Sequence, residues 1–321
     1  MFQNKTARLK PAGRAAALGL LLLGAALAPA GAETLAVGPN APYKTLGEAM
    51  AKLKNGDRIT LAPGEYFECA IIGNDNVTIE GTGADGAAVL TDKACGGKGL
   101  LVTQGDNITI RNITLTRARV PDMNGAGIRN ESPRLLVDRV RFLNNQNGIL
   151  TGGPSEGGTM IVKDSYFEKN GGCFPACTHG IYANRLALLR VEGSTFVETK
   201  QAHHIKSRAA RTEVLNTTTR DGPEGTASYH VDISNGGDLI VRGSTMVKGP
   251  KAENRSAIIM IGAEGVTQRT REIKVENNRV TNEGGYETTF VVNNTAEDAI
   301  LSGNRYTGRI IPLRGDGRAD K

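Results

Sequence analysis

A strand pattern recurs along this sequence about every 26 residues, with individual spacings of 24 to 34 residues. Each copy has an aliphatic residue, a short polar stretch that often contains Gly or Asn, and a second β-forming residue. The first residues of the nine copies are Ile79, Ile110, Val137, Val162, Val191, Leu215, Val241, Val275 and Leu301. A fixed period in this range indicates one supersecondary unit stacked many times. Because helical periodicity is almost absent, the repeat predicts a parallel β-helix.

Each predicted coil contains a second strand after this anchor residue. The middle residues of five such strands are Ile128, Ile149, Ile181, Ile205 and Val231, and segments 258–261 and 290–292 continue the column in looser register. Side chains alternate along a strand, so the middle residue is expected to face the core and its two neighbours to point outward. The predicted core consists of these five residues with Ile79, Ile110, Val137, Val162 and Val191.

The first 32 residues have the pattern of a secretory signal peptide. Four Lys and Arg residues precede an apolar stretch over residues 15–27, and residues 30–32 (Ala-Gly-Ala) resemble a cleavage site. We therefore expect a periplasmic or secreted protein, cleaved after Ala32. The apolar run is too short for a good membrane span, and no membrane span is expected in the mature chain.

The charge of the chain argues against one class of partner. The formal net charge is +6, and four of the positive charges lie in the expected signal peptide. The mature chain would then carry about +2, which is no nucleic-acid footprint but allows a locally basic groove for an acidic ligand. Because the chain has no Trp and few aromatic residues, a platform for stacking neutral sugars is not expected.

Four cysteines in an exported chain predict disulfides. Cys69 and Cys95 are 26 residues apart, which is one coil, and adjacent coils lie roughly 4.8 Å apart, within disulfide reach. Cys173 and Cys177 flank three residues and are able to close a small loop. The alternative is a metal site that adds His179, although the cysteines lack the paired CxxC spacing of zinc sites.

The sequence divides into four parts: the signal peptide (1–32), an N-terminal cap (33–62), a parallel β-helix (63–312) and a disordered tail (313–321). The cap is expected to contain a short amphipathic helix over residues 47–54 and a strand over residues 58–61. A solenoid needs such a cap because an exposed core and open strand edge aggregate. The segment from Tyr43 to Tyr66 closely resembles the opening of pectate-lyase-like right-handed β-helix proteins. This resemblance covers essentially the whole mature chain and implies an all-β, single-stranded, right-handed parallel β-helix.

Aligning the coils brings together polar residues that are far apart in the sequence. All four histidines fall between residues 179 and 230. Arg129 occupies the same column as Tyr182, two coils earlier. β-Helix proteins that process glycans carry their groove on such a parallel-strand face, so the resemblance implies a site there. The residues expected to point outward on three consecutive coils are Tyr182, Asn184, His204, Lys206, Arg208, His230, Asp232 and Ser234.

This mixture of side chains predicts an enzyme that removes the proton α to a uronate carboxylate, as polysaccharide lyases and C5-epimerases do. The reaction needs a base and a cation that stabilises the developing enolate. Lys206 is the candidate base, since neighbouring cations would favour its neutral form. Arg208 is the candidate carboxylate clamp, and Tyr182 or His230 is the candidate proton donor to the leaving oxygen. The candidate substrate-binding residues are Asn184, His204, Asp232 and Arg129.

The stretch from Phe196 to Ala209 resembles the lysine-containing strand of the alginate and dermatan lyases that use a Lys/Arg pair. In that family the arginine lies about one coil later, where this sequence has His230 and Asp232. The family's calcium-binding acid cluster is not evident, so calcium remains a possible ligand and no other cofactor is expected. The Asp-Pro-His-Asp signature of mannuronan epimerases is absent, and Tyr229-His230-Val231-Asp232 matches it only in part.

Other interpretations of the same residues are structural. Lys206 and Arg208 are typical of a solvent-facing sheet that resists aggregation, and Lys206 with Asp232 would form a cross-strand ion pair worth about 0.2–1 kcal/mol. His203 is in phase with Ile205 and is expected to point inward.

The same face allows two further chemistries. A metal site would use His179, His203 or His204, and His230, on neighbouring coils. A hydrolase of the polygalacturonase type needs several clustered carboxylates, and only Asp232 lies in the cluster, with Asp221 and Glu224 in a nearby turn.

Two functional classes therefore remain. The first is an enzyme acting on an acidic, uronate-containing polysaccharide, with lyase and epimerase both open. The second is a non-catalytic β-helix that binds glycan or has a structural role in the cell envelope. In both cases the expected partner is an acidic polysaccharide, and the protein is expected to be a monomer. Uronate binding without turnover would distinguish the second class from the first.

Overall fold

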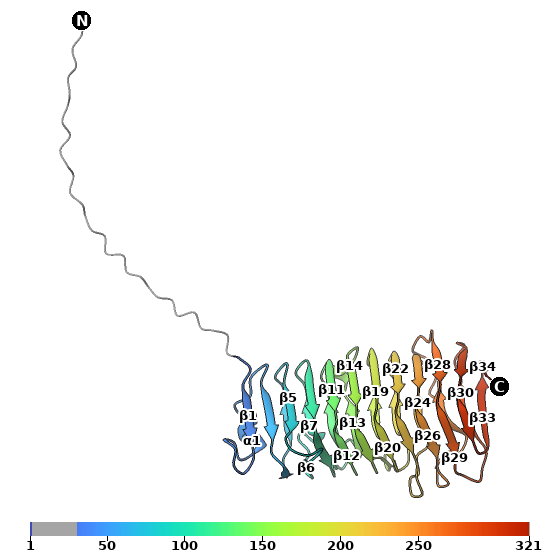
Figure 1. Ribbon diagram of the computed structural model, residues 1–321, viewed down its shortest axis with the longest axis horizontal. Helices are drawn as coiled ribbons and strands as arrows, with labels where there is room; N and C mark the ends of the chain where they lie inside the picture. The colour runs from blue at the N-terminus through green and yellow to red at the C-terminus, as the bar shows by residue number, and fades with distance from the viewer. Residues whose placement is uncertain (2–30, 321) are drawn as a thin grey trace. The chain divides into compact units, whose positions relative to one another are not determined.

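The computed structural model describes Met1 and residues 31–320, so the expected signal peptide lies almost entirely outside the described residues and stays a prediction. From Ala32 onward the chain forms one row of stacked coils (Figure 1). Each full coil contributes one strand to each of three parallel sheets, so neighbouring strands of a sheet are one coil apart in the sequence. The described residues include no helix of the length and apolarity that a membrane span requires.

The strands of the three sheets follow one another in a fixed order along the chain. The first sheet contains β1 (Thr34–Val37), β2 (Arg58–Leu61), β5 (Thr78–Gly81), β8 (Ile108–Arg111), β11 (Arg134–Asp138), β14 (Thr159–Lys163), β19 (Leu188–Glu192), β22 (Arg211–Leu215), β25 (Asp238–Arg242), β28 (Ile273–Glu276), β31 (Ala299–Ser302) and β34 (Gly317–Ala319). The second sheet contains β4 (Ala70–Ile72), β7 (Gly99–Thr103), β10 (Ala126–Asn130), β13 (Asn147–Thr151), β18 (Ile181–Ala183), β21 (Ile205–Ser207), β24 (Val231–Ile233), β27 (Ala257–Ile261), β30 (Thr288–Asn293) and β33 (Ile310–Gly315). The third sheet contains β3 (Gly64–Tyr66), β6 (Ala88–Thr91), β9 (Ile113–Thr116), β12 (Arg141–Leu143), β15 (Tyr166–Glu168), β20 (Thr195–Val197), β23 (Thr218–Arg220), β26 (Thr245–Lys248), β29 (Arg279–Asn282) and β32 (Arg305–Thr307).

The core consists of aliphatic columns that run along the stack, as the repeat predicts. All ten predicted core residues are fully buried. The second-sheet column is also in the predicted register, from Ile128 paired with Ile149 to Ile259 paired with Val291. One anchor is wrong by a residue: Val191 pairs with Val214, and Leu215 lies beside Glu192. Both Val214 and Leu215 fit an aliphatic pattern, so the pattern alone does not distinguish them.

A corner with left-handed backbone joins the first sheet to the third in eight successive coils. The residue at this corner has a φ of about +48 to +63°, a conformation that Gly, Asn and Asp adopt more readily than other residues. This requirement explains the polar centre of the repeat. The corner residues are Asn112, Arg139, Asp164, Gly193, Asn216, Gly243, Asn277 and Gly303.

An aromatic stack fills one interior corner of the middle coils. The rings of Phe142, Phe167 and Phe196 stack with centroids 4.3–4.4 Å apart. The residue opposite is glycine in these coils, because a side chain at Gly127 or Gly148 would meet a phenylalanine ring at 2.8 Å. In the third sheet, Thr219 follows Phe196, and Met246 follows Thr219. The smaller threonine leaves room for larger side chains opposite it.

Both ends of the stack differ from the sequence-based expectation. The helix α1 (Leu46–Met50) is shorter than expected, and it buries Leu46 and Ala49. β1 and β2 already belong to the first sheet, so the β-helix begins within the segment expected to be the cap. The expected disordered tail is wrong for residues 313–319, because β33 and β34 pair with β30 and β31.

Both predicted disulfides, Cys69–Cys95 and Cys173–Cys177, are present. The second lies in a small antiparallel hairpin of β16 (Gly172–Cys173) and β17 (Cys177–Thr178). A single 3₁₀ turn, η1 (Gly153–Ser155), is the other short helical element among the described residues.

Candidate functional site

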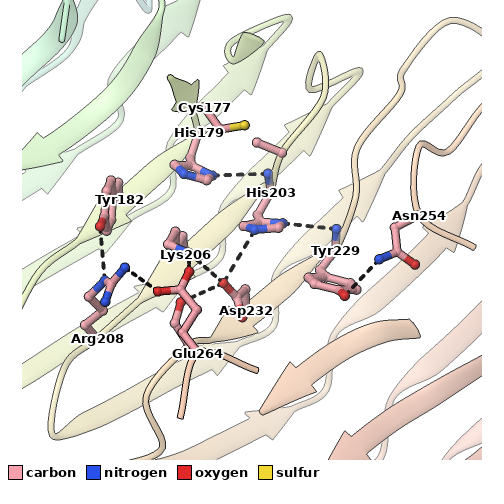
Figure 2. Close-up of polar contacts among 12 residues, drawn as sticks. Cys177, His179, Tyr182, His203, Lys206, Arg208, Tyr229, Asp232, Asn254 and Glu264 are labelled. Atoms are coloured by element: carbon pink, nitrogen blue, oxygen red, sulfur yellow. Dashed lines mark hydrogen bonds and ion pairs between the residues drawn. The ribbon is translucent and has the colours of Figure 1, made fainter. Parts of the chain in front are cut away.

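A hollow of about 840 Å³ lies over the second sheet, and we call it the site hollow. Register places Tyr182 of β18, Lys206 of β21 and Asp232 of β24 in one row across neighbouring strands. The hairpin that contains the Cys173–Cys177 disulfide lines the hollow, together with segment 253–256 and Glu264. Figure 2 shows how the polar side chains from these elements converge.

Lys206 and Arg208 share one carboxylate at the centre of this group. Glu264 accepts from Lys206 Nζ through Oε1 and from Arg208 Nη2 through Oε2, both at 2.5 Å. Lys206 also donates to Asp232 Oδ2 at 3.1 Å. Arg208 Nε donates to the Tyr182 hydroxyl oxygen at 3.0 Å. Both cations therefore lie in a connected network with two carboxylates and a phenol (Figure 2).

The expectation that Lys206 is a neutral base is wrong for this arrangement. Burial lowers the pKa of Lys206, but the carboxylates of Asp232 and Glu264 outweigh this effect and raise the pKa above its usual value. Arg208, one of the neighbouring cations that would favour neutral Lys206, is itself neutralised by Glu264. Lys206 is thus an ammonium at neutral pH. Burial raises the pKa of Asp232, and the donors from Lys206 and Ser234 to Oδ2 oppose this effect.

Rings from three successive coils form a ladder along the wall of the hollow, which we call the ring ladder. His179 stacks on His203 with centroids 4.9 Å apart, and His203 stacks on Tyr229 at 5.0 Å. The backbone N–H of each following ring residue donates to Nδ1 of the preceding histidine at 3.2 Å. Nε2 of His203 therefore carries the proton, and it lies 3.5 Å from Asp232 Oδ2.

His203 faces the hollow, so the expectation that it points inward is wrong. It precedes β21, and strand alternation from Ile205 does not extend to it. Burial lowers the pKa of His203 to about 3, with Lys206 and Lys248 adding to the effect. Burial, His203 and Lys206 likewise hold the pKa of His179 well below its usual range. Both histidines of the ladder are therefore uncharged at neutral pH.

His204 and His230 lie inside the β-helix, so the assignments of His204 to substrate binding and His230 to catalysis are wrong. Both side chains are completely buried. Their Nε2 atoms lie 3.0 and 3.3 Å from Asp221 Oδ1, and their Nδ1 atoms lie 2.7 Å from the hydroxyls of Thr199 and Thr219. We call His204, Asp221, His230 and the buried Lys248 the inner cluster.

The aromatic stack explains why these two histidines turn inward. His204 and His230 follow Gly180 at the position opposite the phenylalanines. At that level Thr219 replaces the ring of Phe196, and the imidazoles occupy the space. Both residues lie before the first residue of a strand, in the corner, where the alternation of strand side chains does not apply.

The inner cluster is electrically balanced without a metal. Burial raises the pKa of Asp221, but His230 and His204 outweigh this effect and hold it well below its usual range. Burial lowers the pKa of His230 to about 4 and that of Lys248 to about 8. One carboxylate and one ammonium are therefore charged at neutral pH. Lys248 Nζ donates to the carbonyls of Ala227 and Ser228.

The donor atoms of the two clusters decide whether calcium fits either of them. Within residues 31–320, the three-residue set whose ligand atoms converge is His204, Asp221 and His230. Calcium takes six to eight oxygen ligands, and two imidazoles beside an ammonium do not fit it. In the site hollow, Asp232 and Glu264 already bind Lys206. The described side chains of the two clusters therefore do not supply an oxygen cage for calcium.

Two predicted substrate-binding residues lie away from the centre of the hollow. Asn184 donates to the carbonyl of Thr151 and lines a second hollow of about 300 Å³, which also contacts Arg185 and Arg208. Arg129 lies 3.4 Å from Glu131. In the second sheet Leu150 separates Arg129 from Tyr182, so Arg129 does not join the Lys206 network.

Sequence reasoning missed two residues of the site, Glu264 and Asn254. Glu264 lies in the loop between β27 and β28, and Asn254 lies in the loop before β27 and donates to the Tyr229 hydroxyl at 2.8 Å. Both loops lie between Val241 and Val275, which are separated by 34 residues, the longest spacing in the repeat, so the length of that coil was the available signal. Loops on a rigid scaffold often carry binding residues.

Comparison with known proteins agrees with the geometry of the coils. A family model described as a right-handed β-helix region matches residues 69–219. The chain is a right-handed parallel β-helix protein, and the predicted resemblance to pectate-lyase-like proteins is confirmed at the level of the fold. A search of curated protein sequences gave no match.

Two solved structures illustrate this similarity. An alginate lyase from Paenibacillus sp. str. FPU-7 is 18% identical, with a TM-score of 0.60, over 87% of this chain and 99% of that chain. The pectate lyase Pel9A is 14% identical, with a TM-score of 0.57, over 91% of this chain and 82% of that chain. At these identities the likeness establishes a shared fold.

Proposed function

We propose that this protein is an exported, carbohydrate-active β-helix that binds an acidic polysaccharide in the site hollow. One observation carries the proposal: Lys206 and Arg208 bind the same carboxylate at the floor of an open hollow, beside the Tyr182 hydroxyl. A uronate presents the same group, and a planar guanidinium with an adjacent ammonium suits its two oxygens. The similar folds named as alginate and pectate lyases support an acidic glycan as the ligand class.

The proposed reaction is removal of the uronate C5 proton, by a lyase or an epimerase. Loss of this proton leaves an enolate, and Lys206 with Arg208 would stabilise its negative charge. Lys206 is held as an ammonium, so the base role moves to Tyr182, whose hydroxyl contacts Arg208. In a lyase the enolate collapses with cleavage of the C4–O bond, and the leaving oxygen takes up a proton. In an epimerase a proton returns to C5 from the other face.

Binding without catalysis is the second candidate, and a specific observation favours it. Both cations are already neutralised by carboxylates, and the two ladder histidines are uncharged with their Nδ1 atoms occupied by backbone donors. A site of this kind recognises carboxylates without an evident strong base. Export to the periplasm or the medium remains part of the proposal in both cases, and the two disulfides support it.

The deciding experiment is ultraviolet absorbance of the protein mixed with a panel of polyuronates, with and without calcium. We expect unsaturated product from the wild type and none from Lys206→Ala or Tyr182→Phe. Lys274→Ala, on the first sheet and paired with Glu272, is the matched control and should keep wild-type activity. If no substrate gives absorbance, deuterium uptake at C5 tests the epimerase. Binding with neither signal would favour the non-catalytic function.

A further inference from the structure

Glu264 lies in a loop whose turns depend on two glycines, and its side chain extends from this loop into the site. The loop follows β27, and Gly262 and Gly265 have φ values of +77 and +90° on either side of Glu264. Such backbone is strained for residues with a side chain. The Glu264 side chain is 41% exposed, whereas that of Lys206 beneath it is 8% exposed. Glu264 therefore covers Lys206 from the solvent side.

The Glu264 carboxylate bridges the two cations in the way that a ligand carboxylate would. One oxygen contacts Lys206 and the other contacts Arg208. Burial raises the pKa of Glu264, but Lys206 and Arg208 outweigh this effect and lower it, so the group is ionised at neutral pH. A uronate carboxylate has the same two oxygens and charge, and it cannot occupy this position while Glu264 does.

Lys206 and Arg208 each have other hydrogen-bond partners that would remain if the Glu264 side chain moved away. Lys206 would keep Asp232 at 3.1 Å, and Arg208 would keep Tyr182 at 3.0 Å and Asn235 Oδ1 at 2.7 Å. The Glu264 backbone is fixed separately, because its N–H donates to the Ser234 carbonyl at 2.9 Å. Exchange of carboxylates therefore requires movement of an exposed side chain and no loss of the other contacts.

We propose that Glu264 is an internal substitute for the ligand carboxylate, which holds Lys206 and Arg208 in place and gives way to a free uronate. This inference rests on the proposed function and adds a specificity to it. A free carboxylate replaces the charge that leaves with Glu264, whereas a methyl-esterified uronate does not. The site should therefore select de-esterified glycans.

The first test measures calorimetric binding of polygalacturonate oligosaccharides, free or methyl-esterified, to the wild type and to Glu264→Gln. We expect Glu264→Gln to bind the free acid about tenfold more tightly and to leave the weak binding of the ester unchanged. Glu253→Gln is the matched control, since Glu253 lines the same hollow and accepts from the backbone N–H of Ala202; the affinity of this variant should stay within about twofold of wild type. If the wild type binds the free acid, unchanged or weaker binding by Glu264→Gln would overturn the inference.

The second test separates this inference from the proposed function. Galacturonate should raise the melting temperature of Glu264→Ala more than that of the wild type, and galactose should raise neither. This result without binding of any polyuronate would support the internal substitute and refute the proposed function. Equal polyuronate binding by wild type and Glu264→Gln, with no selective effect of galacturonate, would refute the internal substitute and leave the proposed function standing.

Discussion

His203 and His204 are neighbours in the sequence, yet they lie on opposite sides of the wall of the β-helix. His203 belongs to the ring ladder and lies 3.5 Å from Asp232 in the site hollow. His204 belongs to the inner cluster and lies 3.0 Å from Asp221. Each carboxylate also interacts with a lysine, Lys206 outside and Lys248 inside. A histidine, an aspartate and a lysine therefore occur together twice, once outside the wall of the β-helix and once inside it.

The two lysines respond in opposite directions because their neighbours differ. Two carboxylates contact Lys206 and raise its pKa, although burial opposes them. Lys248 has backbone carbonyls as hydrogen-bond partners, and burial lowers its pKa to about 8 because the charges of Asp221 and Glu253 offset burial only in part. The outer set faces an open hollow with an exchangeable acid. The inner set is fully buried, so we expect its removal to affect stability and not glycan binding.

The largest expected effect comes from Asp221→Asn, which removes the carboxylate of the inner cluster. The buried Lys248 would lose a nearby negative charge, and removing the charge that compensates a buried ion costs about 3–5 kcal/mol of the free energy of unfolding. Urea denaturation measures the loss. Asp232→Asn is the matched variant in the site hollow, and it should lose less than half as much because Lys206 keeps Glu264. Equal losses would contradict the distinction between the two clusters.

The next largest effect is a contrast between two variants: His204→Ala should mainly lose stability, and His203→Ala should mainly lose glycan affinity. His204→Ala leaves an interior cavity and removes contacts with Thr199 and Asp221, so the free energy of unfolding should fall by about 3 kcal/mol. Its affinity for acidic glycan should remain close to wild type. His203→Ala should show weaker glycan binding with a smaller loss of stability. Thermal melting measures the stability of both variants, and calorimetry measures their glycan affinity. Equal changes of stability and affinity in the two variants would contradict the comparison.

Acid should destabilise both sides of the wall. Burial lowers the folded-state pKa of His203 to about 3 and of His230 to about 4, below the value near 6.5 expected in the unfolded chain. The unfolded chain thus takes up protons first, and stability falls as pH drops from 6.5 toward 4, by up to about 3 kcal/mol per histidine. Urea unfolding at several pH values measures this slope. The slope should decrease in His203→Gln and in His230→Gln; a slope unchanged in both would exclude these histidines as its source.

The repeat predicted what depends on regular strands and missed what depends on corners and loops. Ile205 and Val231 lie in strands, so alternation placed them correctly in the core. His204 and His230 precede those strands, and their direction depends on the change from Phe196 to Thr219 on another sheet. That substitution is visible in the sequence, but its consequence requires the register between sheets. Glu264 lies in an inserted loop, which has no register to align.

The smallest expected effect concerns the Cys173–Cys177 disulfide beside His179 in the site hollow. The cysteines are four residues apart, so the bond restricts the unfolded chain little, and the double Ser variant should lose about 1–2 kcal/mol. Removing Cys69–Cys95, which spans 26 residues and does not line the site hollow, should cost about 3 kcal/mol. The Cys173/Cys177 variant should lose more glycan affinity than the Cys69/Cys95 variant, because the hairpin of β16 and β17 forms part of the wall of the hollow. If the Cys69/Cys95 variant lost more affinity than the Cys173/Cys177 variant, the hairpin would be a brace of the fold and not a wall of the site.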